Sequence, residues 1–120
     1  MIPELLFPLA GLLLIALGYP IATRRVKPNR WYGLRVPATF ADQTVWYDAN
    51  AATGRDMMTL GAVVLVIALM LPRVTRMRSE TYAGVCGALL GIGSLIMVWR
   101  GWQLANSLLR ERRKGARPLN

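Results

Sequence analysis

Three long apolar runs, separated by two polar and charged segments, divide this chain. The runs cover residues 2–22, 57–71 and 82–102. At about 1.5 Å per helical residue the first run reaches roughly 31 Å, enough to cross a hydrocarbon core of about 30 Å. The middle run reaches only about 22 Å, so its helix must begin near residue 55 or earlier. The pattern predicts an all-α fold, a three-transmembrane-helix bundle with helices at about 2–22, 55–71 and 82–102.

A secretory signal peptide is the alternative for the first run, but the flanking residues favour a membrane helix. A signal peptide carries basic residues before its apolar core and a small-residue cleavage site after it. Here Glu4 lies at the start, no Lys or Arg precedes the run, and Arg24 and Arg25 follow it. Gly11 and Gly18 lie two turns apart and offer a face for close contact with another helix.

A stripe of small residues marks the third run. Gly84, Gly87 and Gly91 recur at spacings of three and four, and the last two form a GxxxG pattern. Small side chains let helix backbones approach closely in lipid. We expect this stripe to pack within the three-helix bundle. The alternative is a homo-oligomer formed through the Gly84/Gly87/Gly91 face.

The segment 27–54, between the first two membrane helices, is the longest stretch that is not mainly apolar. Pro28–Asn29 is a turn signal, and Thr39 followed by Asp42 resembles the capping box that starts a helix. This pattern predicts a short interfacial amphipathic helix from residue 40 to about residue 52. Thr39 would cap its amino end, and Gly54 would lie near its carboxyl end.

On a helical wheel this predicted helix has two mainly apolar lines and a third, polar side. The apolar lines are Phe40, Thr44, Tyr47 and Ala51, and then Ala41, Val45, Ala49 and Ala52; the third side holds Asp42, Gln43, Trp46 and Asn50. Asp48 falls between the two apolar lines, where a carboxylate needs a partner. Arg35 is the first candidate for that partner and Arg55 the second. The alternative is that Asp48 faces water on a helix lying loosely at the surface.

The distribution of charge predicts how the chain lies in a membrane. The 120 residues carry a net charge of +9, although 54% of them are hydrophobic. The first loop and the region from Arg100 onward hold twelve Lys and Arg residues, against three in the second loop. The positive-inside rule therefore places the N-terminus outside and both segment 27–54 and the basic tail 103–120 in the cytoplasm. We expect a single membrane domain over residues 1–120, multi-pass in the inner (plasma) membrane, and no nucleic-acid partner for the tail.

The residue types leave little room for catalysis. The chain has no His and one Cys, Cys86, which lies within the third apolar run. Without His, and with few acids that converge, no nucleophile–base pair or metal site can be assembled. We therefore expect no enzymatic activity, no catalytic residues, no metal and no cofactor. A small oligomeric channel or transporter subunit is the alternative function, and it would need polar groups at membrane depth.

The loop residues resemble the signature of a known family, the SdpI family of bacterial membrane proteins. In order and spacing the resemblance rests on Asn29, Trp31, Tyr32, Gly33, Leu34, Arg35, Pro37, Thr39 and Trp46. The chain departs from the signature in the acidic stretch, which is reduced to Asp42, and at Val36 and Asn50, where the family often has Thr and His. The resemblance is to a single module, without the extra amino-terminal membrane region of longer members.

The resemblance implies a membrane interaction protein that acts by binding. The family's namesake is an immunity protein that protects cells from a secreted peptide toxin and also recruits a transcriptional repressor to the membrane. The implied partners are the lipid bilayer and either a peptide toxin or a cytoplasmic regulatory protein. Gly33 and Pro37 would shape the turn, Arg35 would pair with a carboxylate, and Trp46 would lie at the membrane interface or contact a partner. The predicted binding residues are Asn29, Trp31, Tyr32, Gly33, Arg35, Pro37, Thr39, Trp46 and Asp48.

Overall fold

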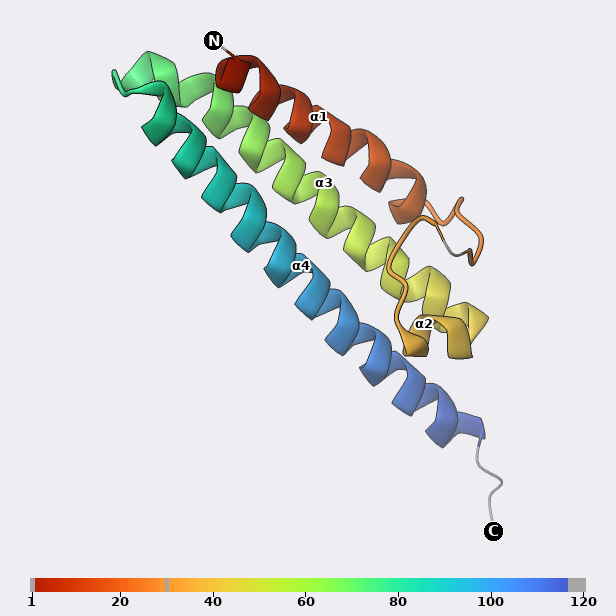
Figure 1. The fold of residues 1–120 in the computed structure, drawn as a ribbon. Helices are drawn as coiled ribbons and strands as arrows, with labels where there is room; N and C mark the ends of the chain where they lie inside the picture. The colour runs from red at the N-terminus through yellow and green to blue at the C-terminus, as the bar shows by residue number, and fades with distance from the viewer. Residues whose placement is uncertain (1, 30, 117–120) are drawn as a thin grey trace.

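The computed structural model describes residues 2–29 and 31–116, and most of these residues are helical. The elements are α1 (Ile2–Ala22), α2 (Pro37–Ala41), α3 (Gln43–Val74) and α4 (Ser79–Ala116). The three long helices are antiparallel to their neighbours, with α3 between α1 and α4 (Figure 1). Each of the three is long and apolar enough to cross a membrane. The predicted all-α bundle of three transmembrane helices, with a short helix between the first two, is confirmed.

Glycines allow α1 and α3 to approach each other closely. A Cβ added to Gly11 would lie 2.7 Å from the carbonyl oxygen of Gly61, and one added to Gly61 would lie 2.5 Å from that of Gly11. Gly18 and Gly54 form a second reciprocal pair, at 2.8 and 2.7 Å. A larger residue at any of the four positions would have to displace a backbone. The predicted close-contact face at Gly11 and Gly18 is therefore confirmed.

Two of the helices are longer than predicted. α3 begins at Gln43, so most of the predicted separate helix 40–52 forms the first turns of α3. Gly54 is not at a helix end: it lies inside α3, buried against the backbone of Ala22. α4 continues through Ala116, so the predicted basic tail 103–120 is helical as far as it is described. Residues 117–120 of that tail lie outside the described residues.

The glycine stripe on α4 faces away from the other helices. A Cβ added to Gly84, Gly87 or Gly91 would have no atom of another helix within 4 Å among the described residues. α4 instead meets α3 at Gly93, where an added Cβ would lie 2.5 Å from the Leu60 side chain. The expectation that the stripe packs within the bundle is wrong, because the buried Tyr82 and Cys86 turn the opposite face of α4 inward.

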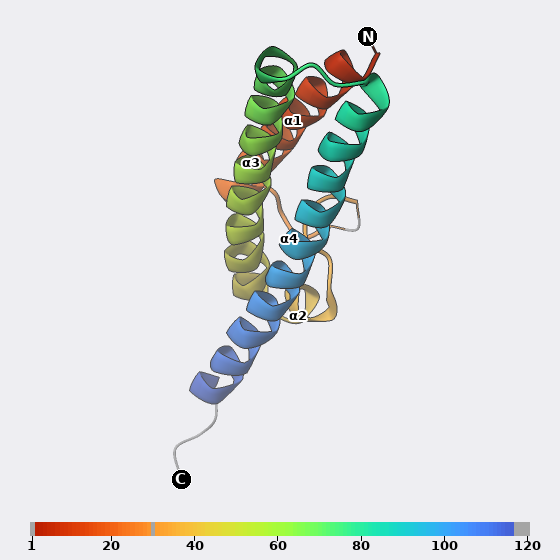
Figure 2. The same ribbon diagram turned by 90° about the vertical axis from the view of Figure 1, so that its left-hand side faces the viewer.

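An apolar cluster joins α2, α3 and α4 at the end of the bundle opposite the N-terminus. Its buried members are Leu34, Ala38, Val45, Ala49 and Ala105. Figure 2 shows α2 beside the carboxyl-terminal half of α4. Leu108 and Leu109 of α4 pack on the same cluster. The part of α4 beyond its apolar run therefore forms a wall for the segment that connects α1 to α3.

Candidate functional site

The segment between α1 and α3, residues 23–42, is called the signature loop below, and it begins with a turn held by Asn29. The Oδ1 of Asn29 accepts hydrogen bonds from the backbone N–H groups of Trp31 and Tyr32, at 2.8 and 2.7 Å. Asn favours such turns because its side chain can replace a backbone partner. The hydroxyl of Tyr32 donates to the carbonyl oxygen of Leu17. Asn29 and Tyr32 thus hold the loop against the end of α1.

Asn50, a residue of α3, connects the middle of the loop to the bundle. Its Oδ1 accepts a hydrogen bond from the N–H of Leu34 at 2.5 Å. Its Nδ2 lies 3.3 Å from the carbonyl oxygen of Leu34 and 3.0 Å from that of Trp46, and donates to both. Gly33 has a φ of +107°, and a Cβ there would lie 2.7 Å from the Oδ1 of Asn50. The positive φ and the close contact both favour glycine, which agrees with the expectation that Gly33 shapes the turn.

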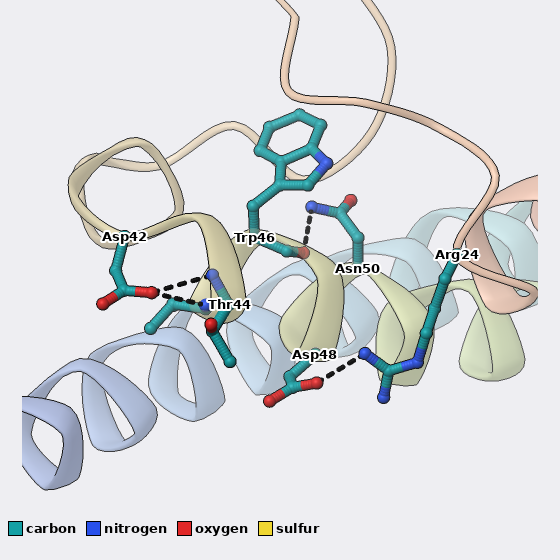
Figure 3. Close-up of polar contacts among 7 residues, drawn as sticks. Arg24, Asp42, Thr44, Trp46, Asp48 and Asn50 are labelled. Atoms are coloured by element: carbon teal, nitrogen blue, oxygen red, sulfur yellow. Dashed lines mark hydrogen bonds and ion pairs between the residues drawn. The ribbon is translucent and has the colours of Figure 1, made fainter.

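Trp46 lies beneath the loop and is fully buried. Its Nε1 donates to the carbonyl oxygen of Val26 at 3.0 Å, and its ring packs on Phe40 with centroids 5.5 Å apart. Figure 3 shows Trp46 and Asn50 both directed toward the loop. The prediction that Trp46 lies at the membrane interface or contacts a partner is therefore wrong. On the side of the helical wheel predicted to be polar, Trp46 and Asn50 are buried, whereas Asp42 is half-buried and Gln43 is exposed.

α2 is a short helix positioned by Pro37 and Thr39. Val36 is extended, with φ −124° and ψ 162°, as expected for a residue before proline. Thr39 is buried, and its Oγ1 accepts a hydrogen bond from the N–H of Val36 at 3.1 Å. The same hydroxyl lies 2.8 Å from the carbonyl oxygen of Val36 and 3.1 Å from that of Leu34. Thr39 therefore closes the turn between the loop and α2.

Asp42 begins α3 and also ties it to the end of α4. Its Oδ1 accepts hydrogen bonds from the backbone N–H groups of Thr44 and Val45, at 2.8 and 3.3 Å (Figure 3). Its Oδ2 lies 3.2 Å from the Nε of Arg112, which donates to it. The prediction that Thr39 caps a helix over residues 40–52 is wrong, because the extended backbone at Asp42 separates α2 from α3 and Asp42 itself caps α3.

Arg24, and not Arg35, is the partner of Asp48. The Nη1 of Arg24 lies 2.5 Å from the Oδ1 of Asp48, and both side chains are partly exposed (Figure 3). Arg35 lines a groove beside α1 and α4, whereas Asp48 lines a different hollow, near the end of α4. The predicted Arg35–Asp48 pair is therefore wrong, and so is Arg55 as the second candidate. The predicted tether of Asp48 to an arginine exists, but it leads to Arg24, two residues beyond the end of α1.

Acidification is expected to release the end of α4 from α3. Partial burial raises the pKa of the Asp42 carboxyl, but the hydrogen bonds from Arg112, Val45 and Thr44 lower it more, so the pKa lies below its ordinary value of 3.8. A carboxyl with a lower pKa in the folded than in the unfolded state stabilises the fold while charged. This contribution is lost as the pH falls from about 4 through the folded-state pKa.

Amide hydrogen exchange of residues 108–116, corrected for the intrinsic rate, measures this release. We expect exchange to become several-fold faster as the pH falls below about 4. The control is Asp42→Asn, which keeps a capping side chain but cannot titrate. A transition of the same size in the control would contradict the role assigned to Asp42.

The predicted site residues separate into two groups. Those held inside the fold by burial, hydrogen bonds or close packing are Asn29, Tyr32, Gly33, Thr39 and Trp46. Those exposed on the loop surface are Trp31, Arg35 and Pro37. Trp31 is the most prominent of these, because 87% of it is exposed. Asp48 belongs to neither group, since it is half-buried and engaged by Arg24.

The sequence of the signature loop and its neighbouring helices matches a known protein family. A family model described as the SdpI/YfhL protein family matches residues 25–108. The chain belongs to this family. The match starts just after α1 and takes in the signature loop, α2, α3 and most of α4. No curated protein and no solved structure matches the chain.

Within this SdpI-family loop, sequence reasoning missed the role of Asn50 and the ion-pair partners Arg24 and Arg112. A signal for Asn50 exists, because it follows Trp46 by four residues and so shares its helix face. The two arginines lie 24 and 70 residues from their carboxylates. Nothing in a single sequence singles them out among the many other arginines of the chain.

Proposed function

We propose that this SdpI-family protein is a membrane interaction protein that acts by binding, and that its partner contacts Trp31 and Arg35. The observation that supports this is that the signature residues divide into a group held inside the fold and a group exposed on the loop surface. Most signature residues are held inside the fold, whereas the side chains of Trp31 and Arg35 are exposed. A large indole held on the surface by the Asn29 turn adds nothing to either apolar cluster of the fold.

The chemistry of these two side chains suits recognition of a peptide or protein. Trp and Arg are enriched among the residues that dominate binding energy at interfaces. The indole supplies apolar area, and the guanidinium can hold a carboxylate through two parallel hydrogen bonds. The partner is therefore a chain with an apolar side chain close to an acidic group. The two partners implied by the family, a peptide toxin and a cytoplasmic regulatory protein, can both carry these groups. A secreted toxin would have to enter the membrane to reach a loop on the cytoplasmic side.

We also propose that the signature loop and the C-terminus face the cytoplasm, with the N-terminus outside, in the inner (plasma) membrane. The excess of Lys and Arg in the first loop and in the region from Arg100 onward supports this orientation. If all three candidate spans cross the membrane, those two regions lie on the same side, which supports this orientation. A reporter domain fused to the C-terminus that reads as external would overturn this orientation.

Protection of a sensitive host tests the proposed function. Cells with confirmed membrane levels of the protein are challenged with the secreted peptide toxin against which the family's namesake protects. We expect wild-type protein to raise survival, and Trp31→Ala to lose protection by about tenfold or more in toxin dose. The matched control is Trp99→Ala on α4, where 55% of the tryptophan is exposed. Unchanged killing with the wild type, or full protection by Trp31→Ala, would refute the proposal.

A further inference from the structure

A groove of about 610 Å³ lies between α1 and α4, next to the signature loop. Leu17 and Ile21 of α1 line one side, Met97 and Val98 of α4 line the other, and Met57 of α3 lies between them. The loop closes one end of the groove with residues 32–36. Figure 1 shows α1 and α4 on opposite sides of α3, with the loop at the end of α1. The volume falls within the range of about 300–1,000 Å³ that is typical of ligand sites.

The groove is apolar along the helices and basic at the loop. Its helical lining is mainly aliphatic and Met side chains. Thr53 also belongs to that lining. Its buried hydroxyl lies against Gly101 of α4, where an added Cβ would be 2.7 Å away, and we assign it no role in binding. The charged residue of the lining is Arg35, whose side chain is exposed. The groove therefore suits a long apolar group that ends in an anion.

The charges around the groove make this end of the bundle positive. Residues 24–56 carry six Lys and Arg residues and three acids. Each of the three acids is paired with an arginine, in the pairs Arg24–Asp48, Arg100–Asp56 and Arg112–Asp42. The net charge of these residues is therefore about +3, and this charge attracts an anionic group to the end of the bundle where the groove opens.

We propose that this groove binds one anionic phospholipid of the bilayer, with an acyl chain along its apolar walls and the phosphate at Arg35. The walls belong to helices that are long and apolar enough to cross a membrane, so they meet lipid rather than water. Basic pockets between transmembrane helices are typical sites for anionic headgroups. A guanidinium binds phosphate through paired hydrogen bonds. This lipid site goes beyond the proposed partner of Trp31 and shares Arg35 with it, so a partner carboxylate and the lipid phosphate would compete for that guanidinium.

Native mass spectrometry of the purified full-length protein tests the lipid site. The detergent-solubilised protein is titrated with dioleoyl phosphatidylglycerol and, separately, with dioleoyl phosphatidylcholine. We expect one phosphatidylglycerol per chain, bound more tightly than phosphatidylcholine. Arg35→Gln is expected to weaken phosphatidylglycerol binding about fivefold, without an effect on phosphatidylcholine. The matched control is Arg55→Gln, an exposed arginine of α3 outside the groove lining.

Filling the groove gives a second, independent test. Met97→Trp places a large ring between α1 and α4 and is expected to abolish the phosphatidylglycerol adduct. Leu95→Trp, on a part of α4 where the leucine is 73% exposed, is expected to keep it. Equal binding of the two lipids, wild-type affinity in Arg35→Gln, or an adduct that survives Met97→Trp would overturn the proposal. So would a protein dimer in place of the lipid adduct, because a second copy would then occupy the groove.

Discussion

Replacing Asn50 with leucine is expected to detach the signature loop from α3, at a cost of about 2–3 kcal/mol in the free energy of unfolding. Leucine has a similar size but cannot accept the hydrogen bond from the N–H of Leu34. Leu34 is 7% exposed, so its N–H would be left buried without a partner. A buried donor without an acceptor costs about 1–3 kcal/mol. The loss of the two bonds donated by Asn50 adds to this cost.

Thermal melting in detergent, together with trypsin cleavage within the loop, measures the effect of Asn50→Leu. The loop carries trypsin sites at Arg24, Arg25 and Arg35, whereas Lys27 is protected because Pro28 follows it. We expect faster cleavage at these sites, while the α1–α3 pair stays intact. Asn106→Leu, at a half-buried asparagine of α4, is the matched control. If Asn50→Leu resisted trypsin as well as the control, the loop would not depend on Asn50.

Gly54→Ala is expected to force α1 and α3 apart and to lower stability by about 1–3 kcal/mol. The added Cβ would lie 2.5 Å from the backbone nitrogen of Ala22 and 2.7 Å from the carbonyl oxygen of Gly18. Both are backbone atoms of α1, so no side chain can move aside to make room. Intrinsic helix propensity acts in the opposite direction, because alanine is favoured over glycine by about 1 kcal/mol inside a helix.

Gly84→Ala is the matched control for this prediction. It makes the same chemical change in a helix, but an added Cβ there meets no atom of the described residues within 4 Å. We expect the melting temperature to fall for Gly54→Ala and to stay level or rise for Gly84→Ala. Equal melting temperatures in the two variants would show that close α1–α3 packing does not contribute to stability.

The membrane-spanning part of the fold is predictable from the sequence, because the length of an apolar run is local information. α1 spans Ile2–Ala22, the run that the sequence predicts. The ends of α3 and α4 were not predictable in the same way. Both helices continue past their apolar runs, where Val45, Ala49 and Ala105 are buried against one another and not against lipid. That burial depends on contacts between distant segments.

The candidate site is predictable where the backbone dictates the residue and not where two distant side chains must meet. Gly33 and Pro37 have the expected roles because φ and steric limits act within a few residues. The helical wheel assigned Asn50 to a polar face because its side-chain amide is polar. In the structure Asn50 is buried, because that amide forms hydrogen bonds with the loop. The choice of Arg24 over Arg35 for Asp48 depends on how the loop folds, which hydrophobic patterning does not encode.

The signature loop is folded onto α3, so that one face of it is buried and the other is exposed. Cysteine labelling tests this most directly, in a background where the buried Cys86 is replaced by serine. Single cysteines at Ala38 and Ala41 form a matched pair on α2, because Ala38 is 2% exposed and Ala41 is exposed. With a water-soluble maleimide on opened membranes, we predict fast labelling of Ala41→Cys and Arg35→Cys and slow labelling of Ala38→Cys. Equal rates at positions 38 and 41 would show that the loop is not folded onto α3 in this way.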